Sequence, residues 1–106
     1  MSEWIKVAAL AELEPDYPKP VKLGSREIAL YLAGGSVFAT DNICTHAFAR
    51  LSDGIVEGFE VFCPLHNGSF DIRTGQPKNP PCMEPVGTHD CRVENGDVFV
   101  KLVVGE

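Results

Sequence analysis

The chain has 106 residues, enough for one compact domain, and 44% of them are hydrophobic and 23% charged, as in a soluble globular protein. Its formal charge of −6 and its pI near 4.9 argue against nucleic acid or an anionic membrane as partners, because no basic stripe is present to neutralise phosphates. The first residues lack a basic segment followed by an apolar run, and no segment approaches the roughly 20 apolar residues of a membrane span. We therefore expect one domain over residues 1–106, located in the cytoplasm.

Short strand-like segments separated by turn signals run through the chain. In chain order they are EWIKV, PVKL, REIALYLA, SVFAT, FEVFC, SFDI, HDCRVE and DVFVKLVV. One helical turn is expected over residues 8–14, before Pro15 ends it. Gly34-Gly35 and Asn95-Gly96 are dipeptides that favour tight hairpin turns, because both central residues of such turns take positive φ.

The segment REIALYLA shows the period of two expected of a strand. Its alternation places Ile28, Leu30 and Leu32 on one face and Ala29 and Tyr31 on the other. Because helical periodicity is almost absent elsewhere, the chain as a whole is predicted to form an all-β fold, either an antiparallel sandwich or a partly open barrel.

The segment Asn42–Cys82 differs from the rest, since it is rich in expected loops. It ends in TGQPKNPPC, whose three prolines are expected to forbid regular ladder pairing. We interpret this segment as a small subdomain inserted between strands of a larger β-body.

Two mixed cysteine and histidine pairs lie inside this inserted segment. Cys44 and His46 form a C-x-H pair, sixteen residues follow, and Cys63 and His66 form a C-P-x-H pair. Taken singly, a cysteine is often a small buried hydrophobe and a histidine a surface residue. Together the four residues predict a metal site. Tetrahedral zinc is one candidate, although zinc fingers usually pair like with like, and a [2Fe–2S] centre with two thiolates and two imidazoles is the other.

The double motif resembles the Rieske iron–sulfur family. The surrounding FATDNICTH, LSDGIVEG and CPLHNGSFDIRTGQP are similar to the Rieske ferredoxins of bacterial aromatic-ring-hydroxylating dioxygenase systems, and the resemblance covers essentially the whole chain. It implies a Rieske fold and one [2Fe–2S] cluster, with Cys44 and Cys63 on one iron and His46 and His66 on the other. It further implies that the imidazoles bind through Nδ1 and that a proline-rich third loop, QPKNPPC, covers the cluster.

The ligand set and its surroundings predict a low-potential centre. Two thiolates and two neutral imidazoles leave the oxidised centre uncharged, so Rieske potentials lie at about −150 to +300 mV, against about −400 mV for plant-type ferredoxins. High-potential respiratory members carry a serine and a tyrosine where this chain has Gly68 and Phe70, and disulfide-forming cysteines where it has Ala49 and Leu65. Ser69 lies one place from the family's serine, and we expect its hydroxyl to point elsewhere.

The remaining cysteines and the third histidine have less specific surroundings. Cys82 and Cys91 are interpreted as two partly buried free thiols, in preference to a disulfide, because the cytosol keeps thiols reduced. His89 is expected at the surface.

Apolar residues near the four ligands either shield the cluster or form a docking rim around the exposed imidazoles: Phe48, Leu51, Leu65, Pro80 and Pro81. Acidic residues near the ligand loops are expected to be mainly solvated, with some steering a basic partner face: Asp53, Glu57, Glu60 and Glu84.

The resemblance implies a one-electron carrier, not an enzyme. A flavoprotein reductase that uses a nicotinamide cofactor would reduce it, and it would pass the electron to a terminal oxygenase that hydroxylates an aromatic substrate. We expect a monomer with no nucleic-acid or membrane partner. Two alternatives are the small Rieske-like subunit of a nitrite reductase and a structural zinc module, while the length argues against a Rieske oxygenase.

Overall fold

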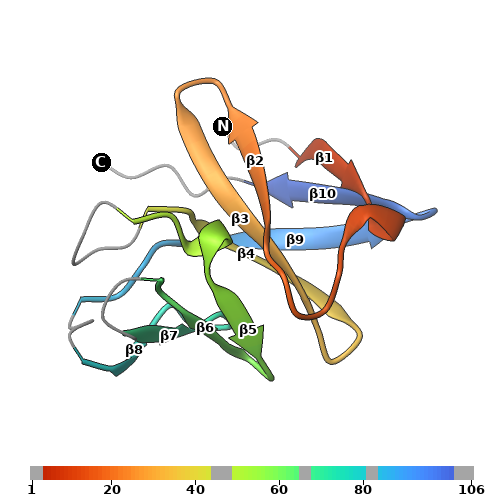
Figure 1. Ribbon diagram of the computed structural model, residues 1–106. Coiled ribbons are helices and arrows are strands. Elements are labelled where there is room, and N and C mark those ends of the chain that lie inside the picture. Colours follow the sequence, from red (N-terminus) through yellow and green to blue (C-terminus); the bar gives the residue numbers. More distant parts are fainter. Residues whose placement is uncertain (1–3, 44–48, 65–67, 81–83, 102–106) are drawn as a thin grey trace.

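The fold is built from two antiparallel sheets, as the computed structural model shows for residues 4–43, 49–64, 68–80 and 84–101 (Figure 1). The larger sheet has the order β1-β10-β9-β4-β3-β2, and the smaller sheet has the order β5-β6-β7-β8. The strands of the larger sheet are β1 (Trp4–Ala9), β2 (Lys19–Leu23), β3 (Arg26–Ala33), β4 (Ser36–Asp41), β9 (Thr88–Glu94) and β10 (Asp97–Lys101). Those of the smaller sheet are β5 (Ile55–Glu57), β6 (Glu60–Phe62), β7 (Ser69–Asp71) and β8 (Pro77–Asn79). The predicted all-β fold is therefore confirmed.

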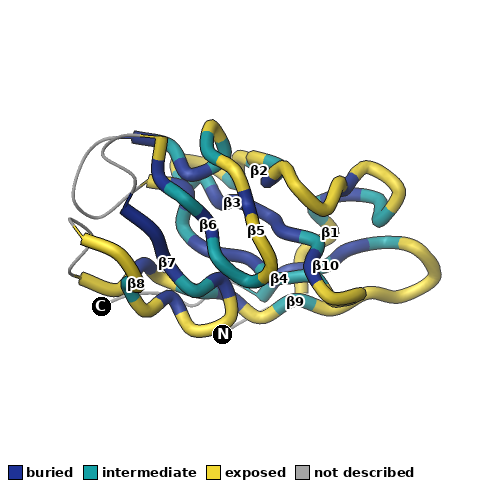
Figure 2. The backbone as a smooth tube through the Cα atoms, turned by 60° about the horizontal axis from the view of Figure 1, so that its bottom comes forward, coloured by how far each residue is buried: buried dark blue, intermediate teal, exposed yellow. Residues whose placement is uncertain are grey.

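Strand β3 is buried on both faces and separates two cores. Ile28 and Leu30 pack with residues of β1, β4 and β10, so one core lies within the larger sheet. Ala29 and Tyr31 pack instead with residues of β5, β6 and β7, so the second core lies between the two sheets. The predicted alternation along REIALYLA is correct. In Figure 2 the buried residues lie mainly along the strands and the exposed residues mainly at the turns.

Both predicted hairpin dipeptides form tight turns. Gly34 and Gly35 have φ of 59° and 80°, and they join β3 to β4 with Ala33 opposite Ser36. Asn95 and Gly96 have φ of 53° and 80° and join β9 to β10 in the same way. Positive φ at both central positions matches the twist of the flanking strands.

Two strands of the smaller sheet differ from the predictions. The prolines of TGQPKNPPC do not prevent pairing, because Pro77 begins β8, which pairs with β7 at the edge of the sheet. A proline is tolerated there because an edge strand has a side that needs no ladder hydrogen bond. Strand β5 was not predicted, since IVE is too short to show a period. The expected helical turn is present as a 3-10 turn, η1 (Leu10–Glu12).

The smaller sheet is an insertion that leaves and rejoins the larger sheet at neighbouring points. β4 and β9 are paired, with Thr40 opposite Thr88, so the chain departs after Asp41 and returns beside it. The backbone N–H of Asp41 donates to the carbonyl of Gly87 at 2.8 Å and closes this junction. None of the helical turns in the described part of the chain has the length and apolar character needed to span a bilayer.

Candidate metal centre

Of the four predicted ligands, the structure describes Cys63. It directly follows β6 and is 1% exposed, within the core between the sheets. Cys44, His46 and His66 lie outside the described residues. Within the described residues no group of three or more His, Cys, Asp or Glu side chains is placed to hold a metal, as expected when a single ligand of the four is among them. The residues that flank each predicted ligand loop are described.

The first stem comprises residues 41–43 and 49–54, which flank the segment that carries Cys44 and His46. Ile43 and Arg50 form an antiparallel bridge. The N–H of Leu51 donates to the carbonyl of Asn42 at 2.6 Å. The two ends of this segment therefore lie side by side, although seven residues separate Asn42 from Arg50.

The second stem comprises residues 62–64 and 68–69, which flank His66. Phe62 pairs with Ser69 in the β6–β7 ladder, and the N–H of Cys63 donates to the carbonyl of Gly68 at 2.7 Å. The segment that carries the C-P-x-H motif is thus flanked by two paired strands. Cys63 shares the core between the sheets with Val61 and with Phe70, which is opposite Val61 in this ladder.

The two stems contact each other at Gly54. The first stem continues through a 3-10 turn, η2 (Leu51–Asp53), into β5, where Ile55 pairs with Phe62 of the second stem. A Cβ atom at Gly54 would lie 1.9 Å from the carbonyl oxygen of Phe62, so only glycine permits this approach. The first stem therefore enters the β5–β6 hairpin at the same end at which the second stem leaves it.

This arrangement fits a metal centre that takes two ligands from each loop. The stems that flank the two Cys/His segments are neighbours, and a buried thiol such as that of Cys63 is the environment in which a cluster is kept from water. A mononuclear zinc site has the same requirement for adjacent loops, so the stems alone do not choose between the two metals. When bound, a [2Fe–2S] cluster would supply one-electron redox chemistry.

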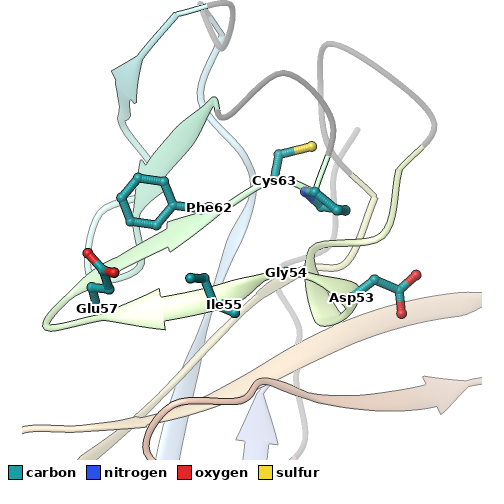
Figure 3. A pocket seen from close by; sticks show the side chains of 7 residues that line it. Asp53, Gly54, Ile55, Glu57, Phe62 and Cys63 are labelled. Atoms are coloured by element: carbon teal, nitrogen blue, oxygen red, sulfur yellow. The ribbon is translucent and has the colours of Figure 1, made fainter.

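A cavity of about 410 Å³ adjoins Cys63 on the outer side of the hairpin (Figure 3). Its lining on one side is β5 and the two residues before it, and on the other side the end of β6 and the two residues after it: Asp53, Gly54, Ile55, Glu57 and residues 62–64. In Figure 3 Cys63 and Asp53 lie at the open end of the hairpin and Glu57 lies near its turn. The cavity thus combines exposed carboxylates with apolar side chains beside one predicted ligand.

The hydroxyl and cysteine positions that raise the potential in respiratory members are filled here by groups that cannot do so. The Ser69 hydroxyl donates to the Glu60 carboxylate on the neighbouring strand. Gly68 is buried and has no side chain, and Phe70 packs in the core. Ala49 is also buried, and Leu65 lies outside the described residues. These observations support the low-potential prediction.

Of the residues predicted to shield the cluster or form a rim, Leu51 is fully buried in the core between the sheets, so it cannot contribute to an exposed rim. Pro80 is exposed. Phe48, Leu65 and Pro81 lie outside the described residues.

The prediction that His89 lies at the surface is wrong. Its side chain is 2% exposed, and its Nε2 lies 2.8 Å from Oδ1 of Asp41, which also accepts from Arg26 at 3.1 Å. The hydrogen bond with His89, followed by the interactions with Arg26, lowers the pKa of the Asp41 carboxyl. In sequence, His89 shares its register in HDCRVE with Cys91 and Val93, which is a signal for burial. Nothing there indicates that a carboxylate 48 residues away accepts its hydrogen bond.

Cys91 is a half-buried free thiol, as predicted. Burial, with a smaller effect of Asp90, raises its pKa to about 12. Cys82 lies outside the described residues.

Comparison with known proteins decides which metal chemistry the motif belongs to. The family model for the Rieske [2Fe-2S] domain matches residues 3–95. The chain belongs to the Rieske [2Fe–2S] domain family. Its cofactor is accordingly one Rieske-type [2Fe–2S] cluster, and the zinc alternative is set aside.

This Rieske chain is similar over nearly its whole length to ferredoxin components. It is 42% identical over 99 residues, 93% of this chain and 95% of the relative, to the ferredoxin component of the naphthalene 1,2-dioxygenase/salicylate 5-hydroxylase systems of Ralstonia sp.. The Sphingomonas yanoikuyae B1 ferredoxin superposes with a TM-score of 0.90 at 36% identity, covering 95% of this chain and 100% of that one.

A solved complex also contains a similar chain. A structure of reduced oxygenase with oxidised ferredoxin in carbazole 1,9a-dioxygenase matches with a TM-score of 0.86 and 36% identity, covering 92% of each chain. A nitrite reductase small subunit from Mycobacterium tuberculosis, described as putative and NADH-dependent, matches with a TM-score of 0.85 at the lower identity of 26%. The higher identities favour the ferredoxin components.

Proposed function

We propose that the chain is the ferredoxin component of an aromatic-ring-hydroxylating dioxygenase system and that it carries one electron at a time. The observation that carries the proposal is the pair of adjacent stems, which flank a C-x-H and a C-P-x-H segment in a chain of the Rieske family. The similarity to ferredoxin components over more than nine-tenths of both chains supports this role.

The proposed ligands are Cys44, His46, Cys63 and His66. Cys63 and Cys44 would hold one iron through thiolate sulfur, and His46 and His66 would hold the other through neutral imidazole nitrogen. Four protein ligands fill both irons and leave no open position for a substrate, so this chain would transfer electrons and perform no substrate chemistry. Burial of Cys63 keeps water from the sulfur side of the site.

The proposed partners are a flavoprotein reductase, which draws on NAD(P)H, and a terminal oxygenase. The oxygenase is supported by the carbazole dioxygenase complex, in which a similar ferredoxin is bound to its oxygenase. The net charge of −6 would attract partners with basic docking faces. His46 and His66 are proposed as the exit edge for electrons. We further propose that the protein acts as a cytoplasmic monomer.

Reconstitution tests this proposal. The purified protein should contain two irons per chain and show a paramagnetic resonance signal after dithionite reduction. It should also restore turnover of an aromatic substrate when mixed with a reductase and an oxygenase of such a system. A colourless, iron-free protein with no signal after reconstitution would contradict the proposal.

The nitrite reductase alternative is kept because one structural match has that description. It predicts stable co-purification with a sirohaem protein, whereas a ferredoxin should dissociate readily from its partners, as is usual for electron-transfer contacts below about 1,200 Å². Size-exclusion chromatography of the native complex distinguishes these two outcomes.

A further inference from the structure

A polar network joins the two ends of the first ligand segment to β3. Asn42, which directly follows β4, is fully buried. Its side-chain Oδ1 accepts from the N–H of Ser52 at 2.7 Å, and its Nδ2 donates to the Ser52 hydroxyl at 2.9 Å and to Glu27 Oε1 at 3.1 Å. Its backbone N–H donates to the Glu27 carbonyl at 3.0 Å, and its carbonyl accepts from Leu51 at 2.6 Å. Asn42 thus contacts β3 through Glu27 on one side, and Leu51 and Ser52, which follow the ligand segment, on the other.

Arg50, which follows the first ligand segment, binds the carboxylate of Glu27 as well. Its Nε donates to Glu27 Oε1 at 3.1 Å and its Nη2 donates to Oε2 at 2.8 Å. This fork-to-fork geometry restricts the orientation of both side chains. The hydrogen bond from Arg50, followed by that from Asn42, lowers the pKa of the Glu27 carboxyl, so Glu27 is charged at neutral pH. One carboxylate therefore holds one stem residue on each side of the ligand segment, Asn42 and Arg50.

The chemistry of this network suits positioning better than simple stabilisation. An apolar side chain of similar volume would serve burial at least as well as Asn42, because a buried amide gains little net free energy from replacing its hydrogen bonds to water. What directional bonds add is one specified geometry, and here every bond of the network falls at the ends of the segment that carries Cys44 and His46. Arg50 is also paired with Ile43 through the backbone, which sets the separation of the two ends.

We propose that Asn42, Glu27 and Arg50 are positioning residues for the first ligand segment, holding its two ends at one separation so that Cys44 and His46 meet the same centre as Cys63. This inference rests on the proposed ligand set. It follows that loosening the network changes the environment of the metal before it changes the overall fold.

The test compares Arg50→Met, Arg50→Lys and Asn42→Leu with a control, Val98→Ala. Val98 is fully buried in the core of the larger sheet, and its truncation should lower global stability without touching either stem. Three quantities are measured on cluster-loaded protein: the resonance g values after dithionite reduction, the reduction potential, and the rate of iron loss to a chelator under native conditions.

We expect Arg50→Met and Asn42→Leu to shift the g values and to lose iron at least tenfold faster than the wild type. Arg50→Lys, which keeps the charge but not the fork, should lie between Arg50→Met and the wild type. Val98→Ala should keep wild-type g values and potential. If Asn42→Leu does not accumulate as folded protein, the two Arg50 variants decide the question.

The inference is overturned if the Arg50 variants keep wild-type g values and potential and lose iron no faster than Val98→Ala. This outcome is distinct from failure of the proposed function. If the proposed function fails, the wild-type protein itself holds no iron and gives no resonance signal. If only the positioning inference fails, the wild type is loaded with iron and its variants resemble it.

Discussion

At the scale of single residues, two ion pairs that each contain an aspartate have different surroundings. Asp41 accepts hydrogen bonds from Arg26 and from His89, whose side chain is 2% exposed. Asp97 meets Lys6 Nζ at 3.3 Å, and the side chains of this pair are 36% and 59% exposed. Water screens the second pair and competes for its hydrogen bonds, but it reaches the His89 side of the first pair poorly.

We therefore expect Asp41→Ala to lower the free energy of unfolding by about 1–2 kcal/mol, since it leaves a buried imidazole N–H without this acceptor. Asp97→Ala should change it by less than about 1 kcal/mol. Urea denaturation at pH 7 measures both values.

The lowered pKa of Asp41 also sets the direction in which stability depends on pH. Its charge stabilises the fold above the unfolded pKa, near 4, and this contribution is lost as the pH falls through the folded value. The difference between wild type and Asp41→Ala should accordingly shrink below about pH 4, and equal costs for the two variants at pH 7 would contradict this assignment.

The raised pKa of Cys91 predicts low thiol reactivity. With a pKa of about 12, almost no thiolate is present at pH 8, because burial disfavours the charged form. Iodoacetamide at pH 8 should label Cys91 in the folded protein far more slowly than in guanidinium, as followed by mass spectrometry of the Cys91 peptide. Labelling at equal rates in the two conditions would show that the thiol is accessible and ionised.

At the scale of elements, the close contact at Gly54 ties the two ligand loops together. A side chain there would overlap the Phe62 carbonyl, next to Cys63, whereas Gly58 in the turn of the same hairpin has open space around its Cβ position and a φ of +60°. The two glycines therefore have different roles: Gly54 permits a backbone approach, and Gly58 permits a turn.

We expect Gly54→Ala to displace β6 at Phe62, to reduce the iron content and to change the visible spectrum. Gly58→Ala should cost about 1–2 kcal/mol of stability from its left-handed backbone and leave the spectrum unchanged. Iron analysis and absorption spectra of the two purified variants provide the comparison. A Gly54→Ala protein with normal iron and a normal spectrum would show that the stems adjust without this contact.

Strands with an apolar pattern or a turn dipeptide in sequence were predictable, among them the short strands β6 and β7, whereas β5 and β8 were not. REIALYLA has eight residues, six of them consecutive apolar residues that suit a strand buried on both faces, and Asn95-Gly96 has a specific backbone requirement, so both identify their elements. The three-residue strands β5 and β8 owe their pairing to neighbours in space. The same holds at the site. The spacing of the motif predicts four ligands, but the network of Glu27, Asn42 and Arg50 joins residues up to 23 positions apart and has no local signal.

At the scale of the whole molecule, the charge of −6 should govern how partners approach. Asp53 and Glu57 are exposed and line the cavity beside Cys63, so acidic groups lie close to one proposed ligand. Long-range attraction to a basic partner face raises the association rate, and salt reduces it because the Debye length falls from about 30 Å at 0.01 M to about 8 Å at 0.15 M.

We expect the rate of electron transfer from the reductase, measured under limiting ferredoxin by stopped flow, to fall as ionic strength rises from about 0.01 to 0.3 M. Replacing Asp53 and Glu57 by Asn and Gln should reduce the dependence on salt. The matched control is Glu94→Gln with Asp97→Asn, a pair located at the β9–β10 turn, far along the larger sheet. A rate that is constant or increases with salt would exclude steering by net charge.

The adjacent departure and return points at Thr40 and Thr88 have a consequence for engineering. A host protein would need two neighbouring antiparallel strands to receive the whole segment between them as a cassette. The host would also have to present small and aromatic side chains in place of Ala29 and Tyr31, since these cover the inner side of the transplanted unit. Redox-active iron could in this way be grafted onto unrelated β-scaffolds that meet both requirements.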